Sequence, residues 1–203
     1  LTNGKTVFDF EVYFSEIFHR SAGFDVAIMN PPYGAEFTDQ EKKVLKRKFN
    51  HITERIRNSF LYFMGLAYNL VKDQGMACFI LPNEFLFQIY MTKARRFFLS
   101  NSQVLFAINT GEDVFEAIVP TCIIAFKKQC LSLYDIPIAD LRDCTREAFQ
   151  QRLATDTFAR TTSDAVINTP NSMFSFDLER SELVTKLSLA FPSFEEFCVD
   201  VAN

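Results

Sequence analysis

Hydrophobic positions in the first two thirds of the chain fall into short continuous runs, separated by segments with helical spacing. Such runs predict strands buried on both faces, as in parallel sheets. The runs are Phe24–Met29, Met76–Leu81, Val104–Asn109 and Val119–Lys128. Helices are predicted to start at Thr38, which opens a T-x-x-E capping box, and to cover 58–72, with Gly75 as the stop, and 84–99. This alternation of strand and helix predicts an α/β open sheet.

The pattern weakens toward the C-terminal part of the chain. The segment LSLYDI, residues 131–136, is predicted to pair with the preceding strand as an antiparallel hairpin. Beyond about Asp140, helices are predicted over roughly 144–154 and 180–190, with a loop over 161–176 between them. We therefore expect a sheet domain over residues 1–140 and a helical and loop-rich tail over residues 141–203.

The first strand ends in an unusual corner, Asn30-Pro31-Pro32-Tyr33. Ligands of open α/β sheets bind at the carboxyl ends of strands, where this corner lies. The prolines fix φ and remove two N–H groups, so the corner offers acceptors: the Asn30 side-chain oxygen and the Pro31 carbonyl. Two fixed acceptors suit a planar –NH2 group, and Tyr33 offers a flat surface for stacking. The corner predicts a site for an amino-bearing nucleobase; the alternative is a proline-stiffened loop with a surface tyrosine.

Charge changes this picture in one segment. The chain has a formal net charge of -4, which does not by itself indicate nucleic-acid binding. Residues 38–57, however, hold seven basic against three acidic residues, a local net charge of +4. Such a segment can lie along a phosphate backbone, or it can be a solvated helix face. The candidate contacts to such a phosphate backbone are Lys42, Lys43, Lys46 and Arg47. A second basic group is interpreted as a solvated helix face and comprises Lys93, Arg95 and Arg96.

Cysteine usage and hydropathy limit the class of protein. The five cysteines form no C-x-x-C pair, and their odd number argues against a disulfide framework. The two histidines lie near no cysteine in the sequence, so no metal site is predicted. We see neither a secretory leader nor a stretch approaching the roughly 18 apolar residues of a membrane helix. We therefore expect a cytoplasmic protein with reduced thiols and no membrane partner.

The segment FDVAIMNPPYG resembles the catalytic motif of amino-methyltransferases that use S-adenosylmethionine. With VFDFEVYFSEIF, GMACFILPNEFL and GEDVFEAIVPTCIIAFKK, the resemblance covers about residues 7 to 128. It is to the adenine-N6 DNA methyltransferases of restriction–modification systems, in particular the Eco57I-like, type IIG group. The resemblance implies an incomplete Rossmann-like sheet, in which residues 1–140 are the C-terminal half of the catalytic domain. Residues 141–203 would lead toward a target-recognition domain.

The resemblance also implies a role for each residue of the corner. Asn30 and the Pro31 carbonyl would accept hydrogen bonds from the N6 amino group of an adenine flipped out of duplex DNA, and Pro32 would complete the rigid corner. Tyr33 would stack on the base, and Phe115 would contact it from the other side. The methyl group would pass directly to N6, without a metal or a covalent intermediate.

The cofactor half of the family pattern is not found in residues 1–23. These residues contain no glycine-rich motif after a strand, and Asp9 is only a loose match to an acid near the cofactor adenine. Asn30 is the other candidate contact to S-adenosylmethionine. We therefore expect that this chain alone neither binds the cofactor well nor methylates DNA. An endonuclease region of the same longer protein would lie outside these residues.

Several alternatives share part of the pattern. The same corner serves enzymes that methylate a glutamine amide in protein or a guanine amino group in RNA. Enzymes that methylate N4 of cytosine more often place Ser or Asp before the prolines. A non-catalytic, DNA-binding partner subunit would keep the fold and the basic helix without methyl transfer. Glu84, near the end of the second strand, is a further candidate for contact with the pocket.

Overall fold

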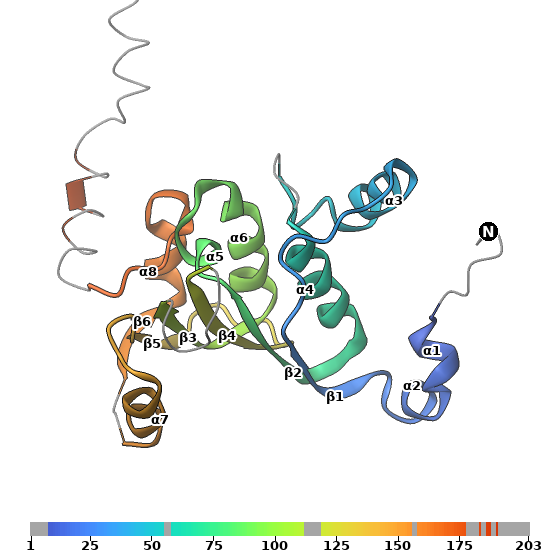
Figure 1. The fold of residues 1–203 in the computed structure, drawn as a ribbon, viewed down its shortest axis with the longest axis horizontal. Coiled ribbons are helices and arrows are strands. Elements are labelled where there is room, and N and C mark those ends of the chain that lie inside the picture. Colours follow the sequence, from blue (N-terminus) through green and yellow to red (C-terminus); the bar gives the residue numbers. More distant parts are fainter. Residues whose placement is uncertain are drawn as a thin grey trace, which may run out of the picture.

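A six-stranded mixed sheet organises the chain, in the strand order β1-β2-β4-β3-β5-β6 (Figure 1). The computed structural model describes residues 8–54, 58–111, 119–155 and 158–177, together with 183, 186, 187 and 190. The strands are β1 (Phe24–Met29), β2 (Val71–Pro82), β3 (Gln103–Gly111), β4 (Thr121–Lys127), β5 (Asp135–Asp140) and β6 (Ala159–Thr162). β1 is parallel to β2 and β3 to β5, whereas β4 runs antiparallel to β2 and β3. The α/β class predicted from the sequence is confirmed.

Helices cover the two faces of the sheet unequally. Figure 1 shows α4, α6 and α8 on one side and α7 on the other. The helical segments are α1 (Phe10–Tyr13), α2 (Ser15–Ser21), α3 (Asp39–Phe49), α4 (Ser59–Leu70), α5 (Glu84–Phe87), η1 (Ile89–Met91), α6 (Thr92–Asn101), α7 (Arg146–Thr155), α8 (Ser163–Asn168) and η2 (Pro170–Ser172). None of these helices is long and apolar enough to cross a membrane.

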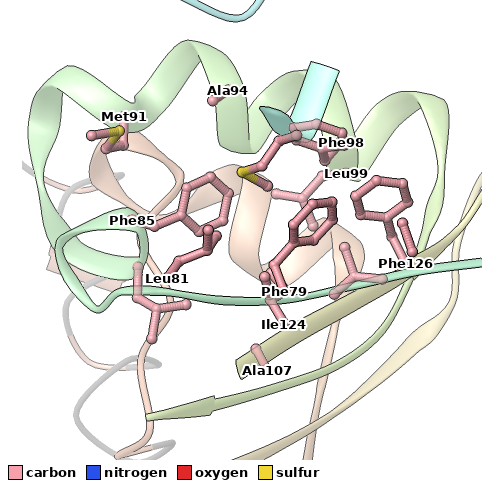
Figure 2. Close-up of a cluster of buried hydrophobic side chains, with 14 of the residues drawn as sticks. Phe79, Leu81, Phe85, Met91, Ala94, Phe98, Leu99, Ala107, Ile124 and Phe126 are labelled. Carbon is pink, nitrogen blue, oxygen red and sulfur yellow. The ribbon is translucent and has the colours of Figure 1, made fainter. Parts of the chain in front are cut away.

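The main core lies between the sheet and the helices α4 and α6 (Figure 2). Phe79 of β2, Phe126 of β4 and Phe98 of α6 stack with ring centroids 5.6 and 4.7 Å apart, and all three are at most 2% exposed. A smaller cluster on the opposite face joins Ile108, Ala139 and Leu141 to Phe149 of α7. Helices therefore cover both faces of the sheet chiefly at β3 and β5, where α7 packs on the face opposite the main core.

β1 is less buried than its sequence predicts. Ala27 and Met29 pack against the main core, but Val26 is 49% exposed and Ile28 is 79% exposed on the other face. Within the described residues β1 pairs only with β2, and α7 lies under β3 and β5. The prediction of a strand buried on both faces is therefore wrong for β1 in this chain, because α7 covers that face of the sheet under β3 and β5 rather than under β1.

The junction between α4 and β2 also differs from its prediction. The helix ends at Leu70 rather than at 72, and Val71 already pairs with Phe24 of β1. Regular pairing resumes at Met76, after a bulge in which Gln74 has a left-handed φ of 66°. Gly23 makes the close approach possible, because its φ is 143° and a Cβ there would lie 2.5 Å from the Leu70 carbonyl oxygen.

Two further predictions are corrected, one by the strand pairing and one by the backbone. The expected hairpin of 131–136 with β4 is wrong, because β5 begins at Asp135 and pairs with β3 and antiparallel β6. The single helix over 84–99 is interrupted at Gln88, whose backbone is extended. The break lets Met91 enter the core while Tyr90 reaches back to Glu84.

The segment 161–176, predicted as a loop, contains the end of β6, all of α8 and all of η2. Thr162 caps α8, since its hydroxyl accepts a hydrogen bond from the Ala165 amide at 3.1 Å. The helix predicted over 144–154 is confirmed as α7. The helix predicted over 180–190 lies almost wholly outside the described residues.

Arg95 is not part of a solvated helix face, which corrects its interpretation from the sequence. Its side chain is 1% exposed and donates to the carbonyl oxygens of Phe85, Asn171 and Ser172 at 2.7–2.8 Å. Burial lowers the pKa of Arg95 to about 10, so the guanidinium remains charged at neutral pH. Lys93 and Arg96 are exposed, as predicted. Arg95 therefore ties the segment after α8 to α5 and α6.

Candidate active site at the carboxyl end of β1

The corner Asn30–Tyr33 follows the last residue of β1, at the carboxyl edge of the sheet. Asn30 and Pro32 are exposed, whereas Pro31 is buried and Tyr33 is half-buried. Within the described residues no backbone N–H donates to the Pro31 carbonyl oxygen. The acceptors predicted from the sequence thus lie at the end of a strand, next to open surface.

Tyr33 is oriented by hydrogen bonds to the strands beside it. Its hydroxyl donates to Asn30 Oδ1 at 3.1 Å and is also 3.3 Å from the Ile80 carbonyl oxygen of β2. Its ring meets the ring of Phe60 edge to face, with centroids 6.4 Å apart. Burial, with a smaller effect of Cys122, raises the pKa of Tyr33, so its hydroxyl stays protonated at neutral pH. The Tyr33 hydroxyl therefore contacts the side-chain carboxamide of Asn30 directly.

Ser59, the first residue of α4, closes the loop that follows the corner. Its hydroxyl donates to the Pro32 carbonyl oxygen and accepts a hydrogen bond from the Ala35 amide at 3.2 Å. The Ser59 residue is 2% exposed. Sequence reasoning missed Ser59, since it lies 27 residues from Pro32 and carries no local signal.

Glu84 lies one step further from the corner. Its carboxylate accepts hydrogen bonds from Asn58 Nδ2 and from the Tyr90 hydroxyl, both at 2.6 Å. Asn58 directly precedes Ser59, so Glu84 is connected to the corner through the start of α4. Burial, and then the hydrogen bond to Glu84, raise the pKa of Tyr90 to about 12, which keeps its phenol a donor.

The other predicted site residues do not gather at the corner. Asp9 caps α1, where its Oδ1 accepts from the Glu11 amide at 2.9 Å. Phe115 lies outside the described residues. The four basic residues are exposed on α3, which Figure 1 shows standing away from the sheet: Lys42, Lys43, Lys46 and Arg47. No cluster of three or more metal-ligating side chains occurs in the part of the chain that the structure describes.

A row of polar side chains continues along the same edge of the sheet. Asn83 Nδ2 donates to Asn109 Oδ1 at 3.2 Å, and Asn109 Nδ2 donates to Asp140 Oδ1 at 3.3 Å. Because β2, β3 and β5 run in the direction of β1, their carboxyl ends lie at the edge that holds the corner. A cavity of about 620 Å³ adjoins this row at Asp140, and its other lining residues are Phe87, Arg142, 169–170 and 173–177.

The chain shares its Rossmann-like fold with part of each of two solved restriction–modification structures. A nuclease-deletion mutant of the Type ISP restriction-modification enzyme LlaGI, in complex with a DNA substrate mimic, has a TM-score of 0.60. The two sequences are 11% identical, and the match covers 81% of this chain and 19% of the LlaGI chain. The type I restriction-modification methyltransferase subunit from Streptococcus thermophilus has a TM-score of 0.57. The two sequences are 19% identical, and the match covers 74% of this chain and 37% of the methyltransferase subunit.

Sequence comparison places the chain within this class. Residues 1–115 match the model of the Eco57I restriction-modification methylases, so the chain belongs to the Eco57I restriction-modification methylase family. A relative in Methanocaldococcus jannaschii, named "Putative type II restriction enzyme and methyltransferase", is 31% identical over 111 residues. These residues are 54% of this chain and 9% of that protein, so the chain spans only a small part of its relative.

Proposed function

We propose that this chain carries the reactive corner of a methyltransferase that modifies N6 of adenine in duplex DNA, with S-adenosylmethionine as the methyl donor. The observation that carries the proposal is the pair of acceptors, Asn30 Oδ1 and the Pro31 carbonyl, side by side at the carboxyl end of β1, where Asn30 is exposed and Pro31 is buried. Membership of a restriction–modification methylase family supports the reaction class. Enzymes that act on a base take it out of the duplex, so the adenine would reach the corner flipped out.

The chemistry follows from the two acceptors. The lone pair of an adenine amino group is delocalised into the ring, which makes the nitrogen a weak nucleophile. Hydrogen bonds from both amino hydrogens to Asn30 and Pro31 favour lone-pair density on the nitrogen and stabilise the positive charge that develops there. S-adenosylmethionine, when bound, would supply an electrophilic methyl group, and the broken S–CH3 bond would leave its electron pair on sulfur in the neutral thioether S-adenosylhomocysteine. After transfer the nitrogen releases one proton to water, and the Tyr33 ring supports the base by stacking.

The residues present fit the substrate better than the cofactor. The Asp9 carboxylate caps α1 through Oδ1, so its observed role is local to that helix. Asn30 is the remaining candidate, and no step is assigned to it beyond holding the amino group. We accordingly expect no binding of S-adenosylmethionine in the micromolar range by residues 1–203 alone. Isothermal titration calorimetry measures this directly, and a micromolar dissociation constant would contradict the expectation.

The proposal extends to partners and to the remainder of a longer protein. The exposed basic residues of α3 support contact with the DNA backbone, where Lys42, Lys43, Lys46 and Arg47 would neutralise phosphates. We further propose that residues 1–140 belong to the catalytic domain and that 141–203 lead toward a target-recognition domain. The name of the archaeal relative joins a restriction enzyme to a methyltransferase, which supports an endonuclease region in the same longer protein.

The experiment that tests the function uses the full-length protein. We would incubate it with S-adenosylmethionine and mixed-sequence duplex DNA and identify modified nucleosides by mass spectrometry. The Asn30→Ala variant is expected to lose activity on the order of 100-fold or more, because one of two acceptors is removed. Asn50→Ala is the matched control, since Asn50 is an exposed asparagine at the end of α3.

Each outcome of this experiment leads to a different assignment. N6-methyladenine that disappears in Asn30→Ala alone supports both the reaction and the site. N4-methylcytosine would keep the mechanism and overturn the choice of base. An unmodified DNA, with the cofactor demonstrably bound, would contradict the proposal and favour a glutamine or RNA substrate or a non-catalytic DNA-binding subunit.

A further inference from the structure

The two prolines of the corner fix only half of its backbone geometry. A proline ring fixes φ, but each residue has a second soft dihedral, ψ, that the ring leaves free. Rotation about ψ of Pro32 would move Tyr33 away from Asn30, to which its hydroxyl donates at 3.1 Å. A rigid corner therefore needs a second constraint, applied to the Pro32 carbonyl group.

Ser59 supplies that constraint. Its hydroxyl donates to the Pro32 carbonyl oxygen and, at 3.2 Å, accepts from the Ala35 amide. These two bonds hold both ends of the short segment that contains Tyr33. Because Ser59 is 2% exposed, water does not readily replace either bond.

Ser59 is itself held by a partly buried chain of polar side chains. Asn58 occupies the N-cap position of α4, where an asparagine side chain normally accepts a hydrogen bond from the first turn. Here the side chain makes no capping bond and instead donates to Glu84 Oε1 at 2.6 Å. Glu84 Oε2 accepts from the Tyr90 hydroxyl at the same distance. The start of α4 thus gives up a helix cap in favour of a fixed connection to α5 and η1.

We propose that Ser59 is a positioning residue for the methyl-transfer corner and that the chain Asn58–Glu84–Tyr90 holds Ser59 in place. The inference rests on the proposed function, which assigns the chemistry to the corner. Ser59 does not touch the reacting atoms. It sets ψ of Pro32 and thereby keeps Tyr33 and the Asn30 acceptor in a fixed relation before the base arrives.

The first test compares Ser59→Ala with Ser163→Ala in the full-length protein. Both serines are 2% exposed and are the first residues of their helices, but Ser163 begins α8 and bonds the Tyr134 amide instead. Ser59→Ala is expected to lower kcat about 10- to 100-fold, with KM for DNA and for cofactor changed less than about threefold. Ser163→Ala should leave kcat unchanged, and Ser59→Thr, which keeps the hydroxyl, should recover most of it.

Amide hydrogen exchange provides a readout that is independent of methylation. The Ala35 amide is expected to exchange about tenfold faster in Ser59→Ala, because its acceptor is removed. The Thr38 amide is the internal control, since it donates to Glu41 Oε2 at 2.8 Å and should not change. Slow exchange at Ala35 in Ser59→Ala would overturn the geometric part of the proposal even if the protein methylates nothing.

A second variant tests the chain behind Ser59. Glu84→Gln keeps the size of the side chain but leaves one oxygen for two donors, Asn58 and Tyr90. We expect kcat to fall about three- to tenfold and Ala35 exchange to accelerate. A wild-type protein that methylates DNA, with kcat unchanged in both Ser59→Ala and Glu84→Gln, would overturn the inference and leave the proposed function standing. An inactive wild type with the expected exchange pattern would overturn the proposed function and leave the structural role of Ser59 standing.

Discussion

β1 and β2 are paired in parallel and have similar apolar sequences, yet they differ in how deeply their side chains are buried. Phe79 and Leu81 of β2 are completely buried, whereas Ile28 of β1 is 79% exposed. β2 has a strand on each side and helices above it, and β1 has a neighbour on one side only within the described residues. The candidate chemistry nevertheless lies at the end of β1. A reactive corner on the less covered strand must therefore obtain its rigidity locally, from prolines and from Ser59.

The largest loss of stability is expected from a substitution in the buried strand β2. Phe79→Ala should lower the free energy of unfolding by about 3–5 kcal/mol, because it leaves a cavity beside Phe126 under α6. Chemical denaturation of the chain measures this. Phe8→Ala is the control, since Phe8 is 55% exposed, and it should change the value by about 1 kcal/mol or less. Equal losses at the two positions would contradict the expectation that burial of the ring sets the cost of its removal.

A slightly smaller effect is expected from the layer over β2. Arg95→Met should cost about 2–4 kcal/mol, because it removes the donor to the carbonyl groups of buried Phe85 and Ser172 and of half-buried Asn171. Lys93→Met on the same helix, where the side chain is exposed, should stay within about 0.5 kcal/mol. Thermal or chemical unfolding of the two variants measures these costs. An unchanged free energy of unfolding in Arg95→Met would mean that water satisfies these carbonyl groups.

The two arginines of α6 also mark the limit of prediction from sequence. Helical spacing places Arg95 and Arg96 together on a polar side, and nothing local distinguishes them. The difference arises from residues 171 and 172, more than 70 positions later, whose carbonyl groups meet Arg95. Long-range partners of this kind have no signature in a hydrophobic pattern, and the same holds for Ser59 and Pro32.

Local signals, in contrast, predicted much of the sheet. The strands at Phe24 and Met76 and the capping box at Thr38 lie where sequence placed them, because each depends on a continuous run or on a four-residue motif. The pairing of β5 failed because two strands close in sequence suggested a hairpin, whereas the register joins β5 to β3. Of the candidate site, the acceptors of Asn30 and Pro31 could be anticipated, but the donors that hold the loop could not.

A substitution on the exposed face of β1 sharpens the comparison further. Ile28→Thr should change the free energy of unfolding by about 1 kcal/mol or less, because Ile28 is 79% exposed and threonine keeps the β-branch that suits a strand. The matched control is Ile124→Thr on β4, where a buried hydroxyl without a partner should cost more than 2 kcal/mol. A loss above about 2 kcal/mol at Ile28 would show that this face is covered in solution, for example by a second copy of the chain.

The smallest effect is expected from the ion pair that links the two strands at their start. Lys72 Nζ of β2 lies 2.5 Å from Asp25 Oδ1 of β1, and the Asp25 side chain is 75% exposed. The hydrogen bond from Lys72, and then its charge, hold the pKa of Asp25 below its ordinary value. A lowered carboxyl pKa stabilises the fold above the pKa of the unfolded chain, near about 4, and this stabilisation is lost as the pH falls through the folded value. Because solvent screens the pair, Asp25→Asn should shift the unfolding midpoint only slightly at neutral pH in about 0.1 M salt, and not at all in about 1 M salt. A large shift that persists in high salt would mean that this end of β1 is as well covered as β2.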